Sequence, residues 1–429
     1  MFDPNPSSRI EELYKLFESY PTVVTDSRRV ITNSIYFALK GVFFDGNKFA
    51  DAALRSGAAY AVVDDASLVE ESPCLSSKYF LVDDVLTAMQ ELAHLHRQRL
   101  NIPILAITGS NGKTTTKELT AAVLSRKYRV VATVGNLNNH IGVPLTLLSM
   151  NHNTEFGVVE MGANAQGEIE LLSAIAAPNF GIINNIGRAH LEGFGGVEGI
   201  KRGKGELLDY LAQRGDGVAF VAEDDVVLVE MAEGRPTLKK ELYSFGLASG
   251  MKHQLEGDFN LKNIAAAVAI GRYFGVEEGD IESAIASYIP QNNRSQRKET
   301  QRNTLIMDCY NANPSSMELS ISNFLKESFE PYDKKSMILG DMFELGEWSA
   351  EEHLRVVRQA TSVADVELFL VGHNFAEVAP RVDTTERAVH FFASRDELLE
   401  YLSSNPISSH TILIKGSRGV GLEVVAEHL

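Results

Sequence analysis

A glycine-rich turn carries the most specific chemical signal in the chain, within ITGSNGKTTTKE at residues 107–118. An apolar run leads into the turn and a helical pattern starts near Lys113, so backbone N–H groups and a helix N-terminus converge on one point that suits a phosphate. Lys113 can reach the β- and γ-phosphates, and the Thr114 hydroxyl can ligate Mg²⁺. An ordinary strand-to-helix turn is the alternative. We predict an ATP-binding loop made of Gly109, Ser110, Asn111, Gly112, Lys113, Thr114 and Thr115.

Two further polar residues follow apolar runs of the strand type. Glu160 ends FGVVE, and His190 comes soon after GIINNIG. In open α/β sheets, ligands bind at the carboxyl ends of the strands, so both side chains are candidates for the same site. A strand-end acid and a structural histidine remain the alternatives to a ligand-binding role.

Alternating strand and helix patterns must position these residues. From IPILAITG onward, strand patterns such as EFGVVEMG alternate with helical patterns such as EIELLSAIAA and GIKRGKGELLDYL, which predicts a parallel sheet covered by helices. The segment before residue 82 predicts a small α/β unit, and residues 85–100 predict a connecting helix. Residues 288–303 are polar and rich in turn residues, which predicts a linker. A second α/β unit is predicted after it, from the strand patterns TLIMDCY, SMILGDM, VELFLVG, AVHFFA and TILIKGS.

Composition limits the function classes. The 429 residues are 44% hydrophobic and 23% charged, which is typical of a globular protein of roughly two to four domains. The net charge of −17 disfavours general nucleic-acid binding and requires a focused cationic site for any anionic substrate. Two cysteines form no metal-ligand spacing, and no stretch reaches membrane-spanning length. We expect a cytoplasmic monomer that binds no nucleic acid.

The loop departs from the common phosphate-binding pattern, because Ile107 stands where that pattern has its first glycine. Its sequence resembles the loop motif of the Mur ligase superfamily, Thr-Gly-x-Asn-Gly-Lys-Thr. The resemblance extends over nearly the whole chain, through TDSRRVITNSIYFALKG, GNLNNHIGVPLTLL, VVEMGAN, NNIGRAHLEGFGG, DCYNANPSSM, LGDMFELGEWSAEEH and IKGSRGVGLE.

The resemblance implies an α/β protein of three domains. Residues 1–82 would form a small UDP-substrate-binding domain, residues 83–290 a central parallel-sheet P-loop ATPase domain, and residues 291–429 a C-terminal Rossmann-like domain. If two domains contribute to one nucleotide site, catalysis requires domain closure.

The resemblance also implies metal ligands and a modified lysine. Thr114, Glu160, His190 and Lys204 would hold Mg²⁺, and Lys113, His190 and Lys204 would take part in catalysis. Related ligases carry a carbamylated lysine at the place of Lys204, where the carbamate helps to hold a second metal. Carbamylation needs a neutral amine and hence burial. A solvated helix cation is the alternative, and the alignment could slip to Lys201 or Arg202.

Other expected contacts come from the same resemblance. Those with the nucleotide would be made by Asn260, Asn263, Arg294, Asp308 and Tyr310, and those with the UDP moiety by Ser27 and Arg28. Phe259 and Asn47 stand where histidines are usual, which leaves the contacts of those two side chains open.

The C-terminal motifs DCYNANPSSM and LGDMFELG resemble those of the family members that add a dipeptide. They imply that the chain joins D-alanyl-D-alanine to the terminal carboxylate of UDP-MurNAc-tripeptide, through an acyl phosphate formed from ATP. Two alternatives stay open: another amide ligase of the superfamily, which adds a single amino acid or resembles folylpolyglutamate synthase, and a nucleotide-binding module that makes no bond.

Overall fold

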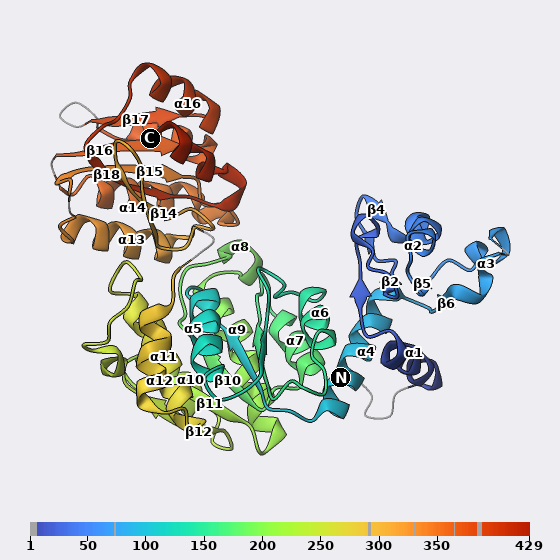
Figure 1. Ribbon diagram of the computed structural model, residues 1–429. Coiled ribbons are helices and arrows are strands. Elements are labelled where there is room, and N and C mark those ends of the chain that lie inside the picture. Colours follow the sequence, from blue (N-terminus) through green and yellow to red (C-terminus); the bar gives the residue numbers. More distant parts are fainter. Residues whose placement is uncertain (1–6, 73, 291–292, 330, 364, 384–387) are drawn as a thin grey trace.

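The computed structural model describes residues 7–429, apart from residues 73, 291–292, 330, 364 and 384–387. Three β-sheets of four to six strands follow one another along the described chain, and each is accompanied by helices (Figure 1). The predicted α/β class is confirmed. In the described part of the chain, no helix is long and apolar enough to cross a membrane.

The first sheet is small and parallel. Its order is β1-β2-β5-β6, with bounds Val23–Val24, Ile35–Phe37, Tyr60–Val63 and Tyr79–Leu81. The helices α1, α2 and α3 accompany it, at Ser8–Ser19, Ala50–Arg55 and Ser67–Glu71. A short antiparallel hairpin, β3 and β4, spans Lys40–Gly41 and Phe44–Asp45.

The long helix α4 runs from the first sheet to the second. It spans Val85–Leu100, as the sequence predicts. It begins where the side chain of Asp84 accepts a hydrogen bond from the backbone of Thr87, and ends at Asn101, which has left-handed backbone. One end of α4 packs on α1, while α6 and α7 of the next unit pack along it. The two units therefore share this helix.

The second sheet is parallel throughout and has the order β12-β11-β10-β7-β9-β8. From β7 to β12 the strands span Ile104–Thr108, Val130–Ala132, Phe156–Glu160, Phe180–Ile183, Val218–Ala222 and Lys239–Tyr243. Helices α5 to α12 span Lys113–Leu124, Gly142–Leu148, Glu168–Ala176, Leu191–Phe194, Val197–Arg214, Val226–Glu233, Asn260–Tyr273 and Glu278–Ser287. The chain changes direction across the sheet at β7 and β10, which is where such sheets bind ligands.

The third sheet has the order β13-β14-β18-β15-β16-β17. These strands span, in chain order from β13, Gln296–Glu299, Thr304–Asp308, Lys334–Gly340, Val366–Val371, Val389–Phe392 and His410–Lys415. Helices α13 to α16 span Pro314–Lys326, Ser349–Ala360, His373–Val378 and Arg395–Ser404. Five strands are parallel, and β13 pairs antiparallel with β14.

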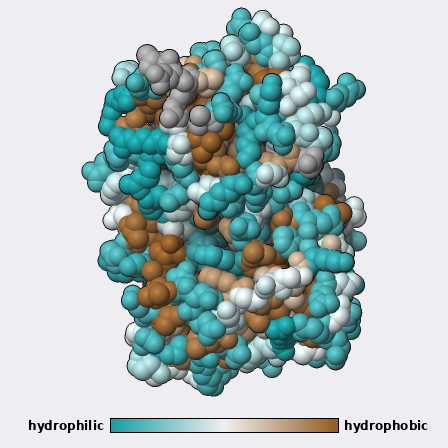
Figure 2. Space-filling model, turned by 90° about the vertical axis from the view of Figure 1, so that its left-hand side faces the viewer, coloured by the Kyte–Doolittle hydropathy of each residue, from teal (hydrophilic) through white to brown (hydrophobic). Residues whose placement is uncertain are grey.

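Strand β13 corrects one expectation, because residues 296–299 were expected within a linker at 288–303. The sequence QRKE is polar and does not by itself predict a strand. It forms one because β14 pairs with it through backbone hydrogen bonds. The exact domain limits stay a prediction, and the expected limit at residue 291 lies outside the described residues. The side formed by the second and third units carries apolar patches separated by hydrophilic surface (Figure 2).

Candidate active site

The predicted ATP-binding loop joins β7 to α5 and depends on two left-handed glycines. Gly109 and Gly112 have φ angles of 137° and 78°, and a Cβ on Gly112 would lie 2.4 Å from Oδ1 of Asn263. Lys113 Nζ folds back over the loop and donates hydrogen bonds to the carbonyls of Gly109 at 2.7 Å and Ser110 at 3.3 Å. Burial lowers the pKa of Lys113, against the pull of the Glu160 carboxylate. The first turn of α5 buries Thr114 and Thr115.

The segment after β10 holds the loop in place. Ser110 Oγ donates to the Gly187 carbonyl at 3.0 Å, and the backbone N–H of Asn111 donates to Asn185 Oδ1 at 3.0 Å. Asn185 Nδ2 returns a hydrogen bond to the Asn111 carbonyl at 3.0 Å. Sequence reasoning missed these partners, although both lie in the quoted motif NNIGRAH. The loop is therefore braced across the point where the sheet changes direction.

The buried carboxylate of Glu160 faces the first turn of α5. Thr114 Oγ1 donates to Glu160 Oε1 at 3.2 Å, and Asn138 Nδ2 donates to the same oxygen at 2.8 Å. Among the described residues, Glu160 Oε2 has no hydrogen-bond partner, and the nearest cation is Lys117 Nζ at 3.9 Å. A buried carboxylate oxygen without a hydrogen bond is rare. This oxygen and the Thr114 hydroxyl fit a hard cation such as Mg²⁺.

His190 reaches the same region from the start of α8. Its backbone is left-handed, with φ of 55°, and its Nδ1 pairs with Glu344 Oε2 of the third unit. Glu344 is also left-handed, with φ of 60°, and its carbonyl accepts a hydrogen bond from Glu192 N at 3.2 Å. When Nδ1–H donates to a carboxylate, the lone pair of Nε2 is available to a metal. His190 thus fits the ligand role that the resemblance implies.

Lys204 lies on α9 and is only 2% exposed. Its Nζ donates to the Ala163 carbonyl at 3.1 Å and lies 5.1 Å from the ring centre of Phe194. Within the described part of the chain, no carboxylate lies within 4.0 Å of it to form an ion pair. Burial, together with the charge of Lys113, holds the pKa of Lys204 well below its ordinary value. Lys204 is therefore not a solvated surface cation.

The neighbouring cations Lys201 and Arg202 are less buried than Lys204, and each has a side-chain partner. Lys201 pairs with Glu198 at 2.9 Å, and exposed Arg202 donates to Gln166 at 3.1 Å. Each of these two cations therefore has a polar partner and access to solvent. Burial therefore sets Lys204 apart from both neighbours, and its carbamylation stays a prediction.

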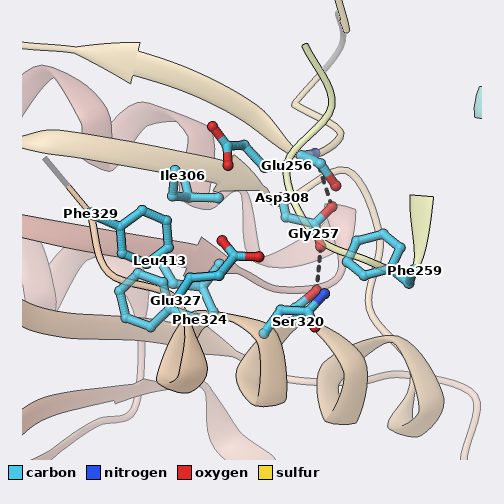
Figure 3. A pocket seen from close by; sticks show the side chains of 12 residues that line it. Glu256, Gly257, Phe259, Ile306, Asp308, Ser320, Phe324, Glu327, Phe329 and Leu413 are labelled. Carbon is cyan, nitrogen blue, oxygen red and sulfur yellow. Dashed lines mark hydrogen bonds between the residues drawn. The ribbon is translucent and has the colours of Figure 1, made fainter. Parts of the chain in front are cut away.

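A narrow cavity lies between the second and third units (Figure 3). Figure 3 shows the rings of Phe259, Phe324 and Phe329 and the carboxylates of Glu256 and Glu327 around it. Burial, assisted by the Glu256 charge, raises the pKa of Glu327. Aromatic walls with acidic groups suit an uncharged base that carries an amino group, and they oppose a phosphate.

Other predicted nucleotide residues lie beside this cavity. Asp308 lines it and accepts hydrogen bonds from Lys415 at 2.6 Å and Ser320 at 2.8 Å. The guanidinium carbon of Arg294 lies 3.8 Å from the ring centre of Tyr310. Arg294 and Tyr310 thus contact each other, and Asp308 lines the cavity, while the binding of a nucleotide by these three residues stays a prediction.

Asn260 and Asn263 lie on the loop side of the same junction. Asn263 Nδ2 donates to Asn260 Oδ1 at 2.8 Å, and Asn263 Oδ1 accepts from Thr116 Oγ1 at 3.1 Å. Their neighbour Phe259 lines the cavity, whereas these two asparagines support the first turn of α5. The pair therefore connects the ATP-binding loop to the cavity.

A second cavity of about 170 Å³ also lies at this junction, and His190 and Glu344 line it. From the third unit it is lined by Asn313, Phe343 and Arg418, among others. Asn313 Nδ2 also donates to Asn111 Oδ1 of the loop at 2.7 Å. The third unit therefore touches the loop directly, a contact that sequence reasoning missed because it joins residues 202 positions apart.

The predicted UDP-binding residues lie apart from this junction, on the first unit. Arg28 is highly exposed and pairs with Asp26 at 2.8 Å, next to Ser27 in a short 3-10 helix. Asn47, which replaces a usual histidine, is buried and donates to Asp64 at 2.6 Å. Asn47 therefore supports the first unit from within.

Comparison with known proteins agrees with this geometry. Two family models match: the Mur ligase middle domain over residues 107–255, and the Mur ligase glutamate ligase domain over residues 293–418. A UDP-N-acetylmuramoyl-tripeptide–D-alanyl-D-alanine ligase of Bacillus subtilis is 35% identical, across 95% of this chain and 92% of the relative.

Solved structures give the same result. A crystal structure of MurF from Acinetobacter baumannii is 28% identical, with a TM-score of 0.82, and the match covers 99% of this chain and 98% of that one. MurF from Thermotoga maritima in complex with ADP is 25% identical, with a TM-score of 0.79, over 95% and 96% of the two chains. The chain therefore belongs to the Mur ligase family, in its UDP-N-acetylmuramoyl-tripeptide–D-alanyl-D-alanine ligase (MurF) branch.

Proposed function

We propose that this protein uses ATP to join D-alanyl-D-alanine to the terminal carboxylate of UDP-MurNAc-tripeptide, a step in peptidoglycan precursor synthesis. The observation that carries the proposal is the arrangement beside the loop: Lys113 interacts with the charges of Glu160 and Lys204, and His190 pairs across the junction with Glu344 of the third unit. The B. subtilis relative, named for this reaction, supports the choice of substrates. The two free cysteines fit the reducing cytoplasm in which we place the reaction.

The nucleotide would lie across the junction. We place its phosphates on the loop residues Gly109 to Thr115, with Lys113 and Arg294 supplying positive charge, and its base in the aromatic, acidic cavity beside Asp308. Asn260, Asn263 and Tyr310 would support this position from the two sides. The UDP moiety would lie on the first unit, at Ser27 and Arg28.

Mg²⁺ would be held by Thr114, Glu160, His190 and a carbamylated Lys204, and would supply charge neutralisation between the phosphates and the incoming carboxylate. The Glu160 oxygen without a hydrogen bond and the buried amine of Lys204, whose pKa is lowered by burial, support this set. Glu344 would keep the His190 ring oriented through Nδ1.

The chemistry then runs in two steps. An oxygen of the tripeptide carboxylate attacks the γ-phosphorus of ATP, the bond to the bridging oxygen breaks, and ADP leaves, while Lys113 stabilises the charge that develops. The amine of the dipeptide attacks the resulting acyl phosphate, loses a proton, and expels inorganic phosphate. Closure of the third unit over the loop would exclude water, which otherwise hydrolyses the acyl phosphate.

Isotope labelling tests this proposal. With the tripeptide carboxylate labelled in oxygen-18, one label should appear in the released phosphate, because that oxygen attacks phosphorus. Mass spectrometry of the products should show the pentapeptide only when ATP, UDP-MurNAc-tripeptide and D-alanyl-D-alanine are all present. Retention of every label in the peptide, or ligation of a free amino acid to UDP-MurNAc-dipeptide instead, would favour another ligase of the family. ATP hydrolysis without any ligation would favour a nucleotide-binding module.

A further inference from the structure

The second cavity carries charges of opposite sign. Arg418, in the segment after β18, and Glu344, in the segment before α14, both line it, together with the ring of Phe343 and the amides of Asn311 and Asn313. Its volume of about 170 Å³ is below the roughly 300–1,000 Å³ of common ligand pockets, so it suits a small ligand.

Arg418 brings a cation without an acidic partner. Its guanidinium carbon lies 5.4 Å from the ring centre of Tyr310, and in the described part of the chain it forms no ion pair. Arg395 of the same unit, by contrast, pairs with Asp396 at 3.1 Å. A guanidinium presents parallel N–H groups that match a carboxylate. Arg418 is therefore suited to the anionic end of a ligand.

Glu344 brings the opposite charge, in a fixed position. Its left-handed backbone, its carbonyl contact with Glu192 and the pairing of Oε2 with His190 hold the residue from three sides. A non-glycine residue held in this backbone region is uncommon and clusters at functional sites. No described residue donates a hydrogen bond to its other oxygen, Oε1. That oxygen remains available to an N–H donor.

We propose that this cavity recognises a small zwitterionic peptide by both of its ends, with Arg418 binding the terminal carboxylate and Glu344 Oε1 accepting from the amino group. The proposal rests on the function proposed above and assigns the residues that select its amine substrate. Phe343 supplies apolar surface to a short side chain. A ligand without the terminal carboxylate would leave Arg418 unpaired.

The test compares two dipeptides and two proteins. At saturating ATP and UDP-MurNAc-tripeptide, we expect D-alanyl-D-alaninamide to have a KM about 10- to 100-fold above that of D-alanyl-D-alanine in the unaltered protein, since one charged hydrogen-bonding partner is lost. In Arg418→Ala the KM for D-alanyl-D-alanine should rise by the same factor, and the two dipeptides should then differ by less than about twofold. Arg418→Lys should recover part of the loss. Arg358→Ala, an exposed arginine of α14, is the matched control and should leave every KM unchanged.

The amino end is tested with N-acetyl-D-alanyl-D-alanine, which keeps the carboxylate, lacks the positive charge and should therefore act as a competitive inhibitor. Arg418→Ala should weaken its inhibition, whereas Glu344→Gln should raise the KM for the dipeptide and leave this inhibition unchanged. If Glu344→Gln weakened the binding of the dipeptide and of its N-acetyl derivative equally, the role of Glu344 would be overturned. A rise in the KM for ATP rather than for the dipeptide in Arg418→Ala would assign Arg418 to the nucleotide and overturn its role here. Absence of any dipeptide ligation by the unaltered protein would instead overturn the function on which the inference rests.

Discussion

Thr114 Oγ1 donates a hydrogen bond of 3.2 Å to Glu160 Oε1. This contact joins the first turn of α5 to the end of β9, so the two strongest metal-ligand candidates are held side by side before any ligand binds. Lys117, one turn further along α5, lies 3.9 Å from the other Glu160 oxygen. Contacts with a single helix and its neighbours thus position the carboxylate.

The first prediction concerns the loop. Lys113→Ala and Thr114→Ala should each lower kcat at least about 100- to 1,000-fold, because each removes charge stabilisation or a metal ligand at the transferred phosphoryl group. UDP-substrate binding to the first unit, measured by calorimetry, should stay nearly intact. Lys240→Ala, at an exposed position of β12, is the control and should behave as the unaltered protein. Normal turnover in either loop variant would refute the assignment.

The second prediction tests the modified lysine. Lys204→Ala should lose most activity and regain part of it with formate or acetate, which can occupy the place of the carbamate carboxylate. Lys201→Ala, one helical turn away and paired with Glu198, should stay active and gain nothing from either acid. Intact-protein mass measured under CO₂ provides a second readout. A fully active Lys204→Ala protein would exclude the carbamate.

The third prediction concerns closure of the junction. Arg188 crosses it, with ion pairs to Glu318 at 2.8 Å and Glu352 at 3.6 Å. Because Glu318 is exposed and the buried Glu352 keeps Arg355 as a second partner, Arg188→Ala should lower kcat only about two- to tenfold and leave the KM for the UDP substrate unchanged. X-ray scattering should show a larger radius of gyration in the presence of nucleotide.

Arg355→Ala is the control for that prediction. Arg355 contacts the same Glu352 at 3.6 Å but lies on the same helix, α14, and does not cross the junction. It should therefore change neither kcat nor the scattering curve. An equal effect of both variants would show that the loss comes from α14 itself.

The fourth prediction concerns pH. Burial holds the pKa of His353 below its ordinary value of 6.5, despite its hydrogen bond to the Ser349 carbonyl and the nearby Asp341 carboxylate. Its Nε2 accepts from the backbone of Met342 at 3.1 Å, which requires the neutral ring. Below about pH 6.5 the unfolded chain binds a proton that the folded chain does not, so stability falls as the pH falls.

Denaturant unfolding of the third unit should reveal this linkage. Between about pH 7.5 and about pH 5.5, His353→Gln should be less stable than the unaltered protein at the upper limit and lose less stability toward the lower one. The exposed His152→Gln should keep the full pH dependence. An unchanged slope in His353→Gln would show that His353 titrates normally.

The sequence predicted the local elements of this protein better than it predicted the contacts between them. The loop, α4 and the five parallel strands of the third sheet depend on hydrophobic periodicity and on nearby glycines. Both signals lie in short stretches of consecutive residues. Glu344 and Asn313 were not predicted as partners of His190 and Asn111, because their pairing depends on how two separately folded units meet. The edge strand β13 was missed for a related reason, since its partner and not its own composition makes it a strand.

Helix α4 has a further consequence for the size of the substrate. Its 16 residues make a rigid rod about 24 Å long, and the helix is capped at both ends. Its last turns contact α1, where Arg99 pairs with Glu11 at 2.6 Å, and α6 and α7 of the second unit pack on the same helix. The first and second units are therefore joined through one rigid element. On the function proposed above, the UDP-linked substrate would span a distance that this element helps to fix.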